Sequence, residues 1–118
     1  MKAAASLATV HHPHSHRLDA KEVAAAFGIT LRTLAGVLNV KETTLRTRSH
    51  SANLQPALRK LVLAYDGLGV VFPADEIRKW MHHPLRSLQG LTPLELLRDR
   101  GVASFEALVD EVVGGGYS

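Results

Sequence analysis

Hydrophobic positions recur at steps of three and four residues through most of this sequence, which is typical of amphipathic helices packed in a soluble core. The longest such stretch follows Pro56 and runs to Pro73, which ends it. Its apolar positions are Leu58, Leu61, Val62, Tyr65, Leu68 and Phe72. No stretch requires the two-residue alternation of a β-strand, so the pattern predicts an all-α fold of about seven helices.

Residues that favour helix ends divide the pattern into separate helices. Asp19 is expected to cap a helix over 21–27 that Gly28 ends, and Thr30 to cap a helix over 31–38. After the stop at Pro84, Thr92 and Pro93 predict another helix start, with a cap followed by proline at the first helical position. Near the end of the sequence, Gly101 is expected to interrupt the chain and Ser104 to cap a last helix.

The segment 30–48 has the spacing of a helix-turn-helix. Ala35 is small where two helices cross, Asn39 stands where the turn needs a left-handed residue, and Leu45 anchors the second helix. Outward positions carry groups that bind phosphates or base edges. The candidate DNA-binding residues are Arg32, Lys41, Thr43, Thr44, Arg46 and Arg48. The alternative is a three-helix packing or dimerisation module that binds no DNA.

The polar segment 49–55 is expected to link two regions. We therefore divide the chain into a flexible, histidine-containing arm (1–18), a helix-turn-helix region (19–55) and a second helical unit (56–118). Within the second unit, Trp80 falls at helical spacing with Ile77 and Met81 and is expected to be core. Two glycines, Gly67 and Gly69, interrupt an otherwise apolar helix. They indicate either close approach of another helix across a homodimer or mere slack in this helix.

One string of residues in the second unit resembles a known family. It consists of Trp80, Pro84, Leu88, Gly90, Thr92-Pro93 and Leu96-Leu97. This order is similar to the opening of the toxin-binding domain of Xre/MbcA/ParS-type antitoxins, and the likeness extends over residues 56–118 to a helix that ends in glycines and an aromatic. His82-His83 stand where members of that family commonly carry other residues.

The resemblance implies a type II antitoxin whose partner is a RES-domain toxin that consumes NAD. It also implies that the C-terminal tail enters the toxin's active site. From the helix-turn-helix motif and its basic charge we expect the protein to repress its operon by binding operator DNA, as a homodimer on an inverted repeat. The expected toxin-binding residues are Gly115, Gly116, Tyr117, Ser118, His82, His83 and Arg86. The alternative function is a stand-alone helix-turn-helix transcriptional regulator. An adjacent toxin gene would distinguish the two.

Composition narrows the remaining possibilities. The 118 residues carry a net charge of +3, which permits a nucleic-acid partner, and contain no cysteine, which fits a reducing cytoplasm. No run is long enough to span a membrane.

His11, His12, His14 and His16 could bind a metal or form a titrating arm, but Pro13 and the lack of apolar neighbours give no fixed cage. No nucleophile arrangement or phosphate loop is recognisable. We therefore expect no enzyme activity, cofactor or metal.

Overall fold

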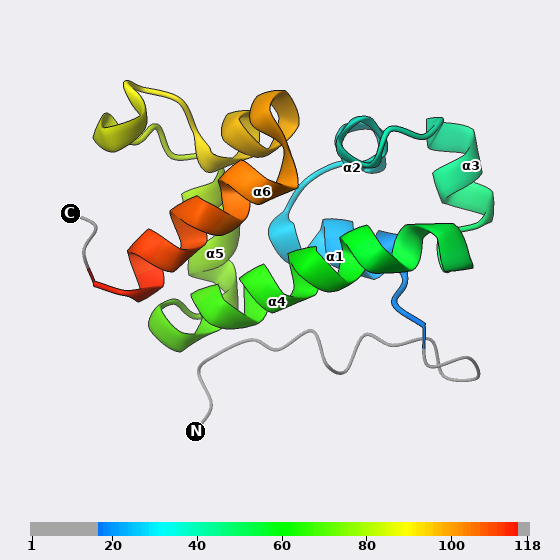
Figure 1. Ribbon diagram of the computed structural model, residues 1–118, viewed down its shortest axis with the longest axis horizontal. Helices are drawn as coiled ribbons and strands as arrows, with labels where there is room; N and C mark the ends of the chain where they lie inside the picture. Colours follow the sequence, from blue (N-terminus) through cyan, green and yellow to red (C-terminus); the bar gives the residue numbers. More distant parts are fainter. Residues whose placement is uncertain (1–16, 116–118) are drawn as a thin grey trace.

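The computed structural model describes residues 17–115, and this part of the chain is helical with no extended strand. The all-α prediction is therefore confirmed. The α-helices are α1 Ala20–Phe27, α2 Leu31–Leu38, α3 Glu42–Thr47, α4 Gln55–Val71, α5 Ala74–Met81 and α6 Pro93–Val113, with 3-10 turns η2 Ala52–Leu54 and η3 Arg86–Leu88. Figure 1 shows α4 running along one side of the molecule, with α6 and α5 beside its C-terminal half and the α2–α3 pair beyond its N-terminal half.

The predicted caps close the helix ends by hydrogen bonds to the chain itself. The Asp19 carboxylate accepts from the amide of Lys21 at 2.9 Å, and the Thr30 hydroxyl accepts from the amide of Thr33 at 3.0 Å. At the start of α6, Thr92 and Glu95 form a reciprocal capping box, with both hydrogen bonds between 2.9 and 3.0 Å. These bonds satisfy amides that a helix start leaves without partners.

Helix α6 bends sharply at Gly101, whose φ of 91° and ψ of 176° are not helical. That backbone region is accessible to glycine almost alone, so glycine at this position permits the bend. The prediction of an interruption here is confirmed. The expected cap at Ser104 is wrong, because the residues directly after Gly101 are already helical and the second section of α6 begins before Ser104.

The segment between α3 and α4 is packed against the fold, although its polar composition predicted a simple linker. Ser49 is buried, and its carbonyl oxygen accepts from the amide of Ala20 at 2.7 Å. The buried Gln55 side chain accepts from the amide of Leu18 at 2.8 Å and donates to the Leu18 carbonyl at 2.9 Å. The start of α1 and the start of α4 are therefore held together by backbone and amide hydrogen bonds.

A chain of aromatic rings runs through the core and joins four helices. Phe27 of α1 contacts Tyr65 of α4 and Phe105 of α6 edge-on, with ring centroids 5.2 and 5.8 Å apart. Phe105 in turn lies 6.3 Å from Trp80 of α5, and Trp80 lies 6.0 Å from Phe72. Such edge and tilted arrangements are favourable beyond the area that they bury. Helix α1 is thereby part of the same hydrophobic core as α4, α5 and α6.

Among the described helices, none combines the length and the apolar character that crossing a bilayer requires.

Candidate partner-binding and nucleic-acid surfaces

The loop between α5 and α6 is a short, tightly bonded connector. Pro84 follows the end of α5, and the buried Leu85 fixes the loop by accepting from the Gly90 amide at 2.9 Å and donating to the Leu91 carbonyl at 3.0 Å. Gln89 adopts a left-handed conformation with φ of 58°, which turns the chain back towards α6. The loop therefore presents its polar side chains from a fixed backbone.

A groove of about 480 Å³ lies between this loop, the end of α4 and the second section of α6. The lining residues are Phe72, Trp80, His83, Pro84, Leu85, Arg86 and Val112. Its floor is apolar and its polar groups are an imidazole and a guanidinium, both exposed. An open groove of this kind fits an apolar or aromatic side chain, with His83 and Arg86 placed to meet acidic or phosphate groups beside it.

The structure brings only some of the predicted toxin-binding residues together. His83 and Arg86 both line the groove. His82 points elsewhere: its Nε2–H donates to the carbonyl oxygen of Gly28 at 3.0 Å, so this side chain ties the end of α5 to the turn after α1. Gly115 is exposed just beyond α6, with φ of 79°. Gly116, Tyr117 and Ser118 lie outside the described residues.

Helices α2 and α3 meet through a tight turn, as the helix-turn-helix spacing predicts. Asn39 is left-handed, with φ of 58° and ψ of 45°, and its amide bonds back to the end of α2. Ala35 and Leu45 are buried where the two helices meet. The small residue, the left-handed turn and the apolar anchor thus occupy the places that their types suggested.

The candidate DNA-binding side chains are all exposed on or beside this pair of helices. Those residues are Arg32, Lys41, Thr43, Thr44, Arg46 and Arg48. One of them is already engaged, because the Arg46 guanidinium forms an ion pair with Glu42 one turn earlier on α3. Helix α3 has six residues, so it offers a short surface to a partner.

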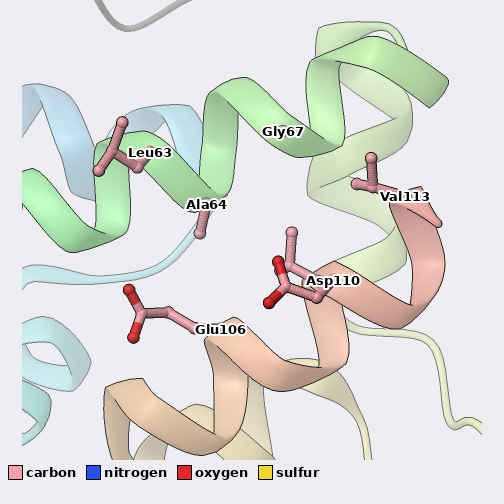
Figure 2. A pocket seen from close by; sticks show the side chains of 7 residues that line it. Leu63, Ala64, Gly67, Glu106, Asp110 and Val113 are labelled. Atoms are coloured by element: carbon pink, nitrogen blue, oxygen red, sulfur yellow. The ribbon is translucent and has the colours of Figure 1, made fainter.

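A second surface was not predicted from the sequence. Leu63, Val70 and Val71 are exposed on α4, and Leu63 lines a further groove of about 330 Å³ between α4 and α6 (Figure 2). The buried stripe of α4 follows the predicted spacing, and these residues fall outside it. Large apolar residues off the buried stripe were the signal that could have indicated this surface.

No group of three or more histidine, cysteine, aspartate or glutamate residues within 17–115 is arranged to hold a metal ion. The histidine cluster of residues 11, 12, 14 and 16 lies outside the described residues.

Comparison with known proteins gives one family and one solved structure. Residues 68–115 match the sequence model of the antitoxin Xre/MbcA/ParS C-terminal toxin-binding domain. The fold is similar to a chain in the crystal structure of the M. tuberculosis MbcT-MbcA toxin-antitoxin complex, with a TM-score of 0.59 and 23% sequence identity over 84% of this chain and 94% of that chain. No curated protein sequence matches. The resemblance first noted between Trp80 and Leu97 is confirmed: residues 68–115, which hold the α5–η3 loop and both sections of α6, are similar to the antitoxin Xre/MbcA/ParS C-terminal toxin-binding domain.

Proposed function

We propose that this protein is the antitoxin of a toxin-antitoxin pair and that it neutralises its toxin by binding it through the C-terminal region. The match of residues 68–115 to a toxin-binding domain carries the proposal. Inhibition by binding requires a shaped surface and no catalytic groups of the antitoxin's own. The groove with His83 and Arg86 supplies such a surface within the matched region.

The toxin that the resemblance implies is a RES-domain enzyme that consumes NAD. A cleft that holds a dinucleotide must hold phosphate groups, and a narrow chain segment can occupy such a cleft. Residues 115–118, Gly-Gly-Tyr-Ser, follow α6 and Gly114. Their glycines have no side chains to clash with a wall, and Tyr117 offers an aromatic anchor with a polar tip. In this proposal the segment enters the toxin's active site while the groove holds the toxin's surface.

The test is neutralisation of a RES-domain toxin encoded by an adjacent gene, measured as the rate of NAD loss with purified components. Deleting residues 115–118 is expected to leave the far-UV circular dichroism and the melting temperature unchanged but to abolish protection. Arg86→Ala, in the groove, is expected to weaken toxin binding. Lys21→Ala, exposed on α1, serves as a control and is expected to leave both toxin binding and protection unchanged. Full protection by the truncated protein would exclude insertion of the tail. Failure of the full chain to bind the toxin would exclude the antitoxin function.

A second activity, repression of its own operon, is supported by the geometry of α2 and α3. A buried anchor, a left-handed turn and six exposed polar or basic side chains are what a helix-turn-helix presents to the major groove and the flanking phosphates. Such proteins bind inverted repeats as dimers, which makes a homodimer the expected DNA-binding form. A stand-alone regulator would use the same surface without a toxin.

Promoter-fragment binding at several salt concentrations tests this activity. The double variant Arg46→Ala/Arg48→Ala should bind more weakly, and the slope of log K against log salt should fall by about 0.9 for each phosphate that the variant no longer neutralises. Glu42→Gln is expected to strengthen binding, because it releases Arg46 from its ion pair. Lys79→Ala, which removes one exposed cation from α5, is the control and should leave the affinity unchanged. Unchanged affinity in the double variant would place the DNA surface elsewhere, and no binding by the wild type would remove the repressor activity.

A further inference from the structure

The chain of aromatic rings through the core ends at the surface of the molecule. Its last two members, Phe72 and Trp80, both line the groove of about 480 Å³, with their ring centroids 6.0 Å apart. Trp80 is 9% exposed and Phe72 is half-buried, so the two rings form a floor that is open to a further side chain. A third ring packed edge-on or offset against such a pair is stabilised beyond the area that it buries. The groove therefore fits one aromatic side chain.

One wall of this groove belongs to the end of α6. Val112 lines the groove, and only Val113 and Gly114 separate it from Gly115. Gly115 is left-handed, with φ of 79°, and its amide donates to the carbonyl oxygen of Val112 at 3.3 Å. A left-handed glycine at this place ends the helix and turns the chain away from the helix axis. The chain therefore changes direction next to the groove.

The residues that follow this turn are long enough to return to the groove. Val112 lies three residues before Gly115, which is about 4.5 Å along a helix axis at a rise of about 1.5 Å per residue. Tyr117 follows Gly115 by two residues, which span up to about 7 Å when extended. Once the chain has turned back, the α-carbon of Tyr117 can lie level with Val112. From there its ring extends over the floor of the groove.

Tyr117 matches the groove in chemistry as well as in reach. Within residues 116–118 it alone carries a ring, and Gly116 before it has no side chain to obstruct the path. The ring suits the aromatic floor, and its hydroxyl can accept a hydrogen bond at the rim, where His83 and Arg86 are exposed. Because the segment is tethered beside the groove, it binds without the loss of translational freedom that a separate ligand incurs. The chain's own segment is therefore favoured over a free ligand as the occupant.

We propose that in the toxin-free protein residues 116–118 fold back on α6 and place the Tyr117 ring in the groove lined by Phe72, Trp80 and Val112. The contact covers the aromatic floor until a toxin arrives. The toxin then takes the groove, and the released segment enters the toxin's active site, so that Tyr117 exchanges one binding surface for another. This exchange rests on the proposed function, whereas the contact in the free protein needs no toxin.

The first test uses the full-length protein without toxin. Trp80 is the sole tryptophan and lines the groove, so its fluorescence reports what covers the floor. Tyr117→Ala is expected to raise the constant for quenching of Trp80 by acrylamide about twofold, because the covering ring is lost. The far-UV spectrum and the melting temperature are expected to stay unchanged, since surface contacts add little to global stability. In NMR spectra of the wild type, nuclear Overhauser effects are expected between the Tyr117 ring and the Trp80 indole.

Two matched variants separate the ring from the rest of the segment. Tyr117→Phe keeps the ring, and Ser118→Ala keeps the whole tyrosine, so quenching of Trp80 is expected to equal that of the wild type in both.

A further variant changes the path of the chain and leaves Tyr117 in place. Gly115→Val puts a β-branched residue at a φ of 79°, which is strained for valine, although no heavy atom lies within 4 Å of the added Cβ. The variant is expected to divert residues 116–118 and to raise the quenching constant as Tyr117→Ala does.

Several outcomes would overturn the proposal. Equal quenching in Tyr117→Ala and the wild type would do so, as would the absence of Overhauser effects between Tyr117 and Trp80. If Ser118→Ala raises the quenching constant as much as Tyr117→Ala, the ring is not the occupant.

Adding a RES-domain toxin from an adjacent gene tests the exchange. The Overhauser effects between Tyr117 and Trp80 are expected to disappear in the complex, and the exchange is wrong if they persist while the toxin is neutralised. A protein that shows the contact but binds no toxin would exclude the antitoxin function and leave the contact established. Failure of the contact and failure of the proposed function are therefore distinguishable.

Discussion

Replacing Phe27 with alanine is expected to lower the stability of the C-terminal half of the molecule as much as that of the N-terminal half. Phe27 lies on α1, in the helix-turn-helix region, yet its ring packs on Tyr65 of α4 and Phe105 of α6. The side chain has no exposed surface. The mutation therefore removes packing that both regions of the chain share.

The size of the effect follows from burial and from the two ring partners. Deleting a buried phenylalanine ring typically lowers the free energy of unfolding by about 3–5 kcal/mol, through the transfer energy of the ring and a residual cavity. Complete burial and two edge-on partners place Phe27 towards the upper part of that range. For about 100 residues the whole stability is about 5–15 kcal/mol, so the variant should lose a large fraction of it.

The assay follows urea unfolding with two probes. Fluorescence of Trp80, the sole tryptophan of the chain, reports the surroundings of α5, and far-UV circular dichroism reports all helices. Both midpoints should fall together in Phe27→Ala, whereas Lys21→Ala, on the exposed side of α1, should change the free energy of unfolding by no more than about 0.5 kcal/mol. A Trp80 transition that stays at the wild-type midpoint would refute the reasoning, because it would mean that the two regions unfold independently.

Three further predictions concern single residues. Thr92→Ala removes half of the capping box at the start of α6 and should lower the free energy of unfolding by about 0.5–2 kcal/mol, measured by urea denaturation. Gly101→Ala should lower it by about 1–3 kcal/mol, because alanine is strained at this backbone conformation, and an unchanged midpoint would contradict that account. Burial raises the pKa of Tyr65 above its usual 10.0, so the fold favours the neutral phenol; stability is fully present below pH 10 and is lost as the pH rises through the higher pKa of the folded state. Tyr65→Phe should therefore lose less stability than the wild type between neutral pH and about pH 11, and equal losses in the two proteins would count against this explanation.

The features that could be predicted from the sequence are those set by local chemistry. Asp19, Thr30 and Thr92 cap their helices because a short polar side chain satisfies nearby amides, and neighbouring residues suffice to show it. The turn at Asn39 and the bend at Gly101 follow from which residues tolerate unusual backbone angles. The all-α fold class could also be predicted, because the three- and four-residue spacing of apolar positions is a local feature of the sequence.

Features that depend on distant parts of the chain could not be predicted in this way. His82 and His83 are neighbours with the same chemistry, but they lie in different surroundings. His82 is hydrogen-bonded to the turn at Gly28, whereas His83 lines the groove. The polar segment 49–55 is packed because Gln55 finds the backbone of Leu18, thirty-seven positions earlier. The start of the last helical section was predicted too late because serine at position 104 favours a helix start. In the structure only Gly101 is non-helical, so the helix begins again directly after it.

The aromatic chain through the core also has a consequence for the protein's synthesis. Phe27 emerges early, but its two ring partners come from positions 65 and 105, so its pocket cannot close until most of the chain has been made. Until then α1 and α4 expose the apolar surfaces that later meet α6, and proteases act readily on such partly folded chains. A nascent chain interrupted before α6 is therefore expected to be degraded rather than stored. The amount of functional protein would then follow the rate of complete translation, with no stable fragment to compete for its partners.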